Sequence, residues 1–582
     1  MNQENEEPSF VDEYEDSPFD ESTGQLDLEN DLSDPNDISL TFPLQILFSL
    51  NGATLSLPST ALMYIVNTRA SIPIVYLSVY GALAFLPNSL KPIYAYLSDF
   101  FPRRDKLLTA LLFLSGASIA STALVPKGGI LACFVIAILR EVFSAWPELL
   151  LGITMLQDAQ TKAAHCRSSS EPTTGTTTTS NFDAIAARFQ SQAATARNMG
   201  SWSATVVGFG FFLYRHYHVT KGSELNDFAV NLILVATGLV NVLGAIFAWY
   251  HRVGYRHGYE RLESEVVPNT VEADMMVSTT RESTKSSQLL CGNVLLIVLL
   301  QLLVVAFAMR SPLVGASSEL VWNLLLLALT SAMIVTVGLN YDKWSRAHRV
   351  GFFLIVRHAI PNSGFLMGSF VYELFQSEPM ALQVFGVFSG GITTLSSWSY
   401  GRLLARYSSA TQIMAVIFGT TLLASVVSLL DVFVTNLDKN DNQWKMIVTV
   451  MAISVFTTFV DEWSFLPSIV LATTAISVQD DHESIATSSD KDSENPETVA
   501  SYQNMRVSLC ECKAPTASIG MQYGTLVSCL DFGDQIGSWL TMPLVAALGI
   551  SRENDWEHMD TFIWTTAVLS LIPLMLLPII RS

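Results

Sequence analysis

Fourteen apolar segments, separated by polar or charged stretches, run through the chain and restrict what it can fold into. Each is long enough for a membrane-spanning helix of about 20 residues, and a helix satisfies its own backbone hydrogen bonds in lipid. We therefore expect an all-α polytopic membrane protein with about 14 transmembrane helices. The segments lie at residues 42–66, 72–98, 106–125, 129–157, 196–215, 228–251, 288–310, 320–340, 350–374, 381–405, 410–435, 446–478, 516–548 and 559–580.

The composition agrees with a membrane protein. Half of the residues are hydrophobic and 14% are charged, whereas a soluble chain carries about 25% charged residues. The net charge of −20 arises mainly in residues 1–40, which hold fourteen Asp or Glu and no Lys or Arg. A segment with few apolar residues and one sign of charge stays disordered, so we assign residues 1–40 to an acidic tail.

Loop charges predict the orientation. With the N-terminus in the cytosol, the loops on the cytosolic side carry 21 Lys or Arg and the outer loops carry eight. Positive residues concentrate on the cytosolic side of membrane proteins. We therefore expect a multi-pass integral membrane protein with both termini in the cytosol. An even number of spans agrees with this, because it requires both termini to lie on the same side.

A long polar stretch at residues 253–287 divides the chain. Six spans precede it, and two additional spans and then six more follow. We expect an N-terminal six-helix bundle at 41–252, a cytosolic loop at 253–287, two extra spans at 288–341, and a C-terminal six-helix bundle at 342–582 with an acidic cytosolic insert at 479–515. Two six-helix bundles are the arrangement of the major facilitator superfamily, in which the substrate binds near the midplane between the halves. The Thr/Ser-rich stretch 158–195 is interpreted as a flexible linker.

The most specific stretch, LPNSLKPIYAYLSDFFPRR, covers residues 86–104. A carboxylate and guanidinium groups at the mouth of a helix pair can hold the two helices together in one conformational state and release them in another. A bias of basic residues toward the cytosol explains the arginines, but not Asp99, nor Lys91, which lies about two helical turns inside the span. We therefore predict a gate, formed by Lys91, Pro92, Ser98, Asp99, Arg103 and Arg104.

This stretch resembles the signature of the folate–biopterin transporter family of the major facilitator superfamily. The matching residues are Pro87, Lys91, Pro92, Tyr94, Ser98, Asp99, Pro102, Arg103 and Arg104, and Ala95 stands where a Gly is usual. Residues 358–374, 459–472 and 522–540 resemble later segments of the same family, although Asp531 stands where an Asn is expected. The resemblance covers roughly residues 42–580 and implies folate, biopterin or a related pterin as substrate.

The fourth span holds two ionisable residues of interest, Arg140 and Glu148. An ionisable group near mid-membrane is costly unless it faces a wet cavity or a partner. Arg140 either binds an anionic substrate while Glu148 titrates, or forms a structural ion pair with Glu141 or Asp461. The family often has two acids four residues apart in this span, and only Glu148 matches one of them.

Two later spans carry pairs of acids. Asp461 and Glu462 lie deep in one span, and Asp531 and Asp534 lie three residues apart on one face of the next. Buried carboxylates can exchange protons near neutral pH, which suits proton-coupled transport. Hydrogen-bonded packing is the alternative for each acid.

The fifth span is rich in small residues, such as Gly200, that allow close helix packing. Asn198 and Trp202 in this span are predicted to face the cavity. If the substrate is a pterin, as the resemblance implies, Trp202 is suited to stack on its flat ring. Lys91 and Arg140 would then bind the glutamate carboxylates of folate.

The sequence contains no nucleotide-binding loop, no paired histidines at helical spacing and no Gly-x-Ser-x-Gly motif. We expect no enzyme activity, no cofactor or metal, and no nucleic-acid partner. The predicted function is secondary active transport by alternating access, of folate- or biopterin-type pterins, coupled to protons and carried out in a lipid bilayer. Two alternatives remain: a transporter of another small organic anion, and a non-transporting membrane receptor or scaffold.

Overall fold

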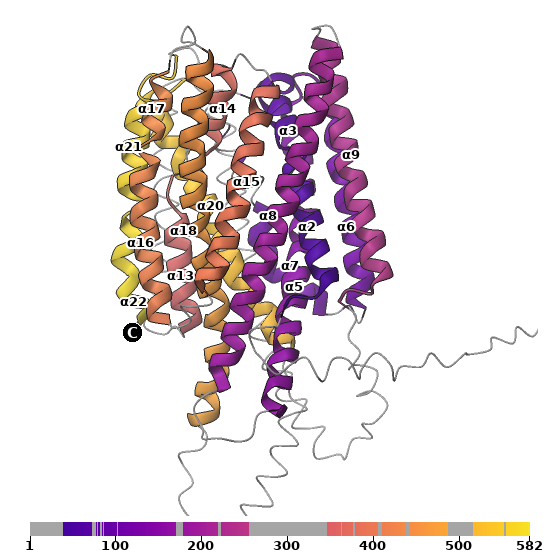
Figure 1. The fold of residues 1–582 in the computed structure, drawn as a ribbon, viewed down its shortest axis with the longest axis vertical. Coiled ribbons are helices and arrows are strands. Elements are labelled where there is room, and N and C mark those ends of the chain that lie inside the picture. Colours follow the sequence, from indigo (N-terminus) through magenta and orange to yellow (C-terminus); the bar gives the residue numbers. More distant parts are fainter. Residues whose placement is uncertain are drawn as a thin grey trace, which may run out of the picture.

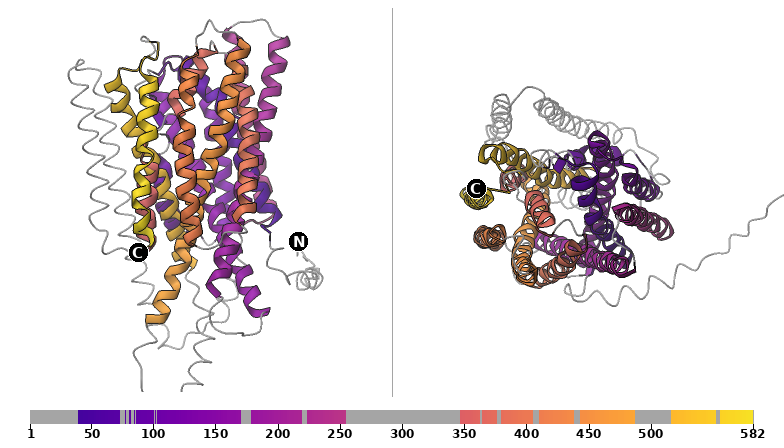
Figure 2. Two further views of the ribbon diagram at one scale, coloured as in Figure 1. Left: turned by 60° about the vertical axis from the view of Figure 1, so that its left-hand side comes forward. Right: turned by 90° about the horizontal axis from the view of Figure 1, so that it is seen from above.

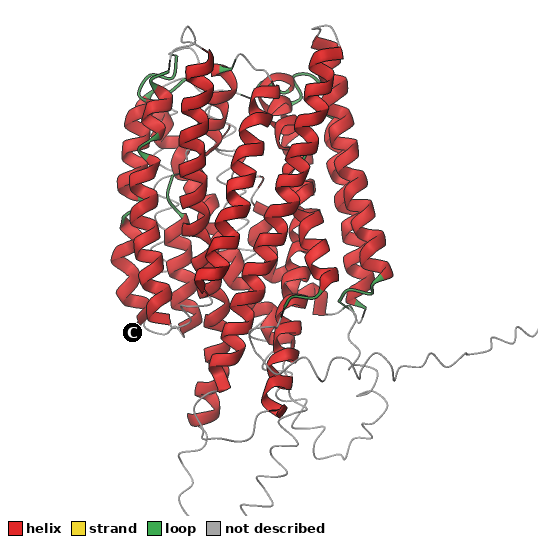
Figure 3. Cartoon of the chain, in the orientation of Figure 1, coloured by secondary structure: helices red, strands yellow, loops and turns green. Residues whose placement is uncertain are grey.

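The computed structural model is built from long helices that run side by side (Figure 1). It describes residues 39–169 apart from several positions between 73 and 102, and residues 178–218, 223–254, 346–361, 364–375, 379–404, 410–437, 443–486, 516–551 and 555–581. Within these residues there is no β-strand (Figure 3). Residues 1–38, the loop 253–287 beyond residue 254, the two extra spans at 288–341 and residues 487–515 of the acidic insert lie outside the described residues.

The first half of the chain supplies seven α-helices among the described residues. They are α2 (Phe42–Ser56), α3 (Ser59–Tyr64), α5 (Lys91–Asp99), α6 (Arg104–Ser121), α7 (Ile130–Ser169), α8 (Thr178–His218) and α9 (Ser223–Tyr250). A π-helical turn (Ile65–Arg69) continues α3, and 3-10 turns (Leu86–Leu90 and Thr122–Leu124) precede α5 and follow α6.

The second half supplies nine described α-helices. They are α13 (Arg346–His358), α14 (Gly364–Leu374), α15 (Pro379–Leu404), α16 (Ala410–Ser428), α17 (Asp431–Thr435), α18 (Gln443–Ala486), α20 (Thr516–Leu548), α21 (Met559–Leu569) and α22 (Leu577–Arg581), with a 3-10 turn (Ile572–Leu576) before the last. Figure 2 shows the two halves beside each other, the first in indigo to magenta and the second in orange to yellow.

The described helices are suited to a membrane. Seven helical stretches of the described residues, among them Arg104–Leu124 and Asp227–Tyr250, are long and apolar enough to cross one. The expected all-α polytopic architecture is therefore confirmed. The count of fourteen spans stays a prediction, because two of the segments lie outside the described residues.

Two large buried clusters bring the halves together. One contains Leu40 and Leu44 at the start of α2 together with Val350, Leu471 and Ile580 of the second half. The other contains later residues of the same span, such as Ile65, together with Phe370 and Trp539. Along α2, the residues of the first cluster therefore come before those of the second, so apolar contacts between the halves occur at two levels. Leu40 and Ile580 lie in one cluster, so the described chain begins and ends at the same end of the bundle.

The interpretation of residues 158–195 as a flexible linker is wrong for most of that range. Helix α7 continues to Ser169 and α8 begins at Thr178. Ala159, Ile185, Ala186 and Phe189 are buried in the cluster that contains Leu40. These apolar residues pack on neighbouring helices, and this packing extends both helices beyond the apolar segments.

Candidate functional site

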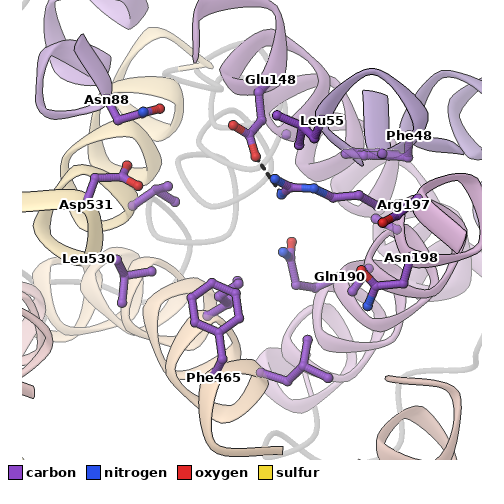
Figure 4. A pocket seen from close by; sticks show the side chains of 18 of the residues that line it. Phe48, Leu55, Asn88, Glu148, Gln190, Arg197, Asn198, Phe465, Leu530 and Asp531 are labelled. Carbon is purple, nitrogen blue, oxygen red and sulfur yellow. Dashed lines mark hydrogen bonds and ion pairs between the residues drawn. The ribbon is translucent and has the colours of Figure 1, made fainter. Parts of the chain in front are cut away.

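A cavity of about 460 Å³ lies between the two halves of the chain (Figure 4). Helices α2, α5, α7 and α8 of the first half and α18 and α20 of the second contribute its walls. Along α2, Phe48 of the first apolar cluster lines the cavity, and the further lining residues Gly52, Leu55 and Ser56 come before the buried residues of the second cluster, such as Ile65. We call this space the central cavity.

Four charged side chains from four helices form a network in the central cavity. The Lys91 ammonium of α5 lies 2.8 Å from Asp531 Oδ2 of α20 and 3.9 Å from Glu148 Oε2 of α7. Arg197 Nη1 of α8 donates a hydrogen bond of 2.6 Å to Glu148 Oε1. Figure 4 shows Arg197 reaching toward Glu148, with Asp531 on another wall. The Lys91–Asp531 pair thus joins the first half of the chain to the second.

The local sequence places Lys91 at this junction. Lys91 is the first residue of α5 and directly follows the 3-10 turn Leu86–Leu90. The Ser528 hydroxyl of α20 donates to the carbonyl oxygen of Ser89 at 2.8 Å and holds α20 against this turn. A Cβ on Gly524 would lie 3.3 Å from the Lys91 carbonyl oxygen, so the glycine permits this close approach. Lys91 is only 4% exposed, and a charge so deeply buried requires a partner.

Another wall of the central cavity carries an amide–carboxylate contact between the halves. Asn198 Nδ2 of α8 donates to Glu462 Oε1 of α18 at 2.8 Å and to Ser397 Oγ of α15 at 3.2 Å. No cation lies within 4.0 Å of Glu462 among the described residues, in contrast to Glu148 and Asp531. Asn198 lines the central cavity.

Arg140 and Trp202 do not line the central cavity. The Arg140 guanidinium donates to Glu141 Oε1 from Nη2 at 2.7 Å and from Nε at 3.1 Å, which is one of the two arrangements expected for this residue. Trp202 is 40% exposed. A Cβ on Gly391 of α15 would lie 3.3 Å from its indole nitrogen, so the ring packs between α8 and α15.

The residues predicted to form the gate do not lie together, because some of them are buried and others are exposed. Ser98 is fully buried and accepts a hydrogen bond of 2.8 Å from Trp146 Nε1, so it holds α5 against α7. Pro92 is buried in the first turn of α5. Arg103 is exposed between α5 and α6, Arg104 begins α6, and the side chain of Asp99 lies outside the described residues. Of the predicted gate residues, Lys91 forms the described charged contact with the opposite half.

A second cavity, of about 420 Å³, lies within the second half. Asp461 of α18 and Asp534 of α20 line it, rather than the central cavity. His358 of α13 also lines it, with Nδ1 3.1 Å from Asp534 Oδ1. The four predicted acids are therefore divided, with Glu462 and Asp531 in one cavity and Asp461 and Asp534 in the other.

Arg197 and His358 were not predicted as site residues. The apolar segment that predicts the fifth span begins at residue 196, so the sequence assigns Arg197 to the preceding cytosolic loop. In the structure, α8 begins eighteen residues earlier, at Thr178, and Arg197 lies within the helix. His358 lies inside one apolar segment, 350–374, which the structure divides into α13 and α14. The Pro361 that separates these helices is the signal that marks the break.

No protein-family model and no curated protein matches the sequence. Solved structures do match over most of the chain. A POT family transporter in complex with 5-aminolevulinic acid is 13% identical in sequence and has a TM-score of 0.51, covering 93% of this chain and 96% of its own.

Two further solved structures have lower scores. The MFS (major facilitator superfamily) proton:xylose symporter XylE from E. coli is 11% identical, with a TM-score of 0.49 and coverage of 92% of this chain and 94% of its own. The nucleoside transporter NupG is 11% identical, with a TM-score of 0.46 and coverage of 93% and 98%. From the likeness to the POT family structure and the helical arrangement, the chain has a fold of the major facilitator type.

Proposed function

We propose that this protein is a secondary transporter that works by alternating access and carries a pterin of the folate–biopterin class through the central cavity. The motif at residues 86–104 supports the pterin substrate, and the major facilitator fold supports the mechanism. The proposal includes coupling to protons and no enzymatic reaction.

The observation that carries the proposal is the buried Lys91–Asp531 contact between the halves. Alternating access moves one bundle against the other around a fixed site. Movement that separates α5 from α20 must break this contact, which is costly for charges in a buried site. A substrate or a proton that compensates Lys91 or Asp531 lowers this cost, and this links the occupancy of the cavity to its opening.

The charges in the central cavity favour a particular kind of pterin. Its lining contains two cations, Lys91 and Arg197, and four carboxylates, Glu141, Glu148, Glu462 and Asp531. Each cation already pairs with a carboxylate of the lining. A pterin ring presents an amino group and a neighbouring ring N–H, which form a donor pair that a carboxylate such as Glu462 can accept. We therefore propose an uncharged pterin such as biopterin in preference to folate, whose glutamate carboxylates would meet an excess of negative charge.

Uptake by cells that produce the protein tests this function. Radiolabelled biopterin is competed with unlabelled folate, with biopterin, and with small organic anions that lack a pterin ring. We expect biopterin to compete more strongly than folate, and the other anions to have no effect. Competition by the unrelated anions as strong as that by biopterin would assign another substrate class, and absence of biopterin uptake at normal surface abundance would favour a receptor or scaffold.

A further inference from the structure

The second cavity is a separate site that shares its walls with the central cavity. The Phe465 ring of α18 lines both spaces. Helices α18 and α20 each present one acid to each cavity: Glu462 and Asp531 to the central one, Asp461 and Asp534 to the second. A movement of α18 or α20 therefore changes both sites together.

Three residues that line the second cavity carry buried polar atoms without partners among the described residues. Arg357 is 8% exposed, and its Nη2 donates to Ser464 Oγ at 2.7 Å, but its Nη1 has no hydrogen-bond partner among the described residues. The hydroxyl of Thr421, which is 6% exposed, and His358 Nε2 also lack partners within the described part of the chain. All three residues line the cavity. A buried unpaired polar group is costly, so these groups indicate that the cavity binds a polar occupant.

A break in a membrane helix forms one wall of this cavity. Between α13 and α14 the chain leaves the helical path, and His358, Ile360 and Pro361 of this region line the cavity. Two glycines let α20 approach the break: a Cβ on Gly533 would lie 2.5 Å from His358 Cβ, and a Cβ on Gly537 would meet the Ile360 carbonyl oxygen. Discontinuous helices form the ion sites of many secondary transporters, because they bring backbone polar groups to the membrane interior.

We propose that the second cavity is the proton-binding site of the transporter, and that a proton bound there is coupled to the substrate through α18 and α20. This proposal rests on the proposed function. A proton bound there protonates one of the carboxylates of Asp431, Asp461 and Asp534, which line the cavity, and the carboxylic acid so formed can donate a hydrogen bond to a neighbouring acceptor.

The groups that face this site come from every helix around it. Arg357 and His358 belong to α13, Asp431 to α17, Asp461 to α18 and Asp534 to α20. The polar groups from α16 and α21 are hydroxyls, and the Tyr400 phenol of α15 lies near Arg357. The contact of 3.1 Å between His358 Nδ1 and Asp534 Oδ1 joins α13 to α20 within the site.

Proteoliposomes that contain the full chain test the proposal with two transport assays. The first is counterflow of labelled biopterin at equal pH, and the second is accumulation of biopterin driven by an inward proton gradient. We expect Asp461→Asn and Asp534→Asn to retain counterflow, because the amide imitates a protonated acid, and to lose gradient-driven accumulation. The matched control is Asp560→Asn on α21, an exposed acid outside both cavities, which should retain both activities. Full gradient-driven accumulation by both cavity variants, or accumulation by the wild type with a sodium gradient in place of a proton gradient, would overturn the proposal.

Proton uptake by the purified protein, without any substrate, separates this proposal from the proposed function. A pH-indicator dye records the protons taken up when the pH is lowered across neutrality. We expect Asp431→Asn and Asp461→Asn, which change the other two acids of this cavity, to take up fewer protons than the wild type and the Asp560→Asn control. Equal uptake by all four proteins would contradict a proton site in the second cavity, whatever the result with biopterin.

Discussion

Several ionisable side chains in the apolar interior form ion pairs. Lys91 contacts Asp531, Arg197 contacts Glu148, and Arg140 contacts Glu141. Such pairing is expected, because an uncompensated charge in the interior costs several kcal/mol. The pairs differ in which helices they connect. The Lys91–Asp531 contact connects the two halves, whereas the Arg140–Glu141 contact lies within α7, so only the first bears on movement between the halves.

The Arg140 pair predicts a stability effect rather than a change of specificity. Arg140→Gln leaves the Glu141 carboxylate without its cation, and breaking a buried pair in this way costs about 3–5 kcal/mol. We expect a lower melting temperature in detergent and lower surface abundance, with an unchanged ratio of folate to biopterin uptake per molecule at the surface. A selective loss of folate transport at normal abundance would instead give Arg140 a role in binding a substrate carboxylate.

Glu462 is the residue for which we predict an effect on substrate affinity. If its carboxylate accepts hydrogen bonds from the pterin ring, Glu462→Gln removes charge-assisted bonds of about 1.5–3 kcal/mol, or about ten- to hundredfold in affinity. Equilibrium binding of labelled biopterin to purified protein measures this, with Asp560→Asn as the matched control. Unchanged affinity in Glu462→Gln would place ring recognition elsewhere in the cavity.

The sequence identifies which spans carry buried charges, because Arg140, Asp461 and Asp531 interrupt long apolar segments. It does not identify the partners. Asp461 and Glu462 are neighbours in the chain yet line different cavities, and this depends on how α18 is rotated against its neighbours. Side-chain partners follow from packing between distant segments, which periodicity along one segment does not determine.

At the scale of helices, the backbones of α2 and α8 approach each other directly at two glycines. A Cβ added to Gly52 would collide with the Arg197 carbonyl oxygen, and one added to Gly200 would collide with that of Ser49. Both contacts are between backbones, so neither helix can relieve them by a change of rotamer. The expectation that Gly200 permits close packing is confirmed. This close approach holds Arg197 at the edge of the central cavity.

We therefore predict that Gly200→Ala destabilises the protein by about 1–3 kcal/mol, the usual cost of overpacking. A fluorescence-based melting curve in detergent should show a lower melting temperature. Gly210→Ala, on the same helix, is the matched control, because a Cβ there meets no atom within 4 Å. Equal melting temperatures for the two variants would show that the two helices can move apart without cost.

Helices as elements are largely predictable here, and their ends and breaks are not. The apolar segment 516–548 coincides with α20, and the segment 228–251 lies almost wholly within α9. In contrast, α7 and α8 continue past their apolar segments, because alanines and aromatic residues at 159–189 pack on neighbouring helices. The break between α13 and α14 lies inside one continuous apolar segment, 350–374, so the hydrophobicity of the sequence predicts a single helix there.

At the scale of the whole molecule, both halves line the central cavity and make apolar contacts with each other at two levels, the first of which includes the cavity residues Phe48 and Leu466. Each level contains residues of both halves, and opening at one end therefore requires that one level separates while the other stays packed. The division of the chain into these halves follows from counting apolar segments. The cavity does not, because its walls come from six helices that are distant in sequence.

The loop charges predict the orientation of the whole molecule. Epitope tags at the N-terminus, within 252–287 and within 479–515 should all be inaccessible to antibody in intact cells and accessible after permeabilisation, because positive loops stay in the cytosol. Immunofluorescence with and without detergent measures this. Labelling of the tag within 479–515 from outside intact cells would invert the orientation or change the number of spans.

The central claim is that the space between the halves carries a pterin across the membrane. Its most direct test is uptake of radiolabelled biopterin into proteoliposomes that contain only this protein and lipid, with and without unlabelled biopterin inside. Alternating access predicts uptake above that of empty liposomes, faster when unlabelled biopterin is inside, and reduced in Glu462→Gln. Uptake equal to that of protein-free liposomes under both conditions, from protein that is folded and inserted, would contradict the account.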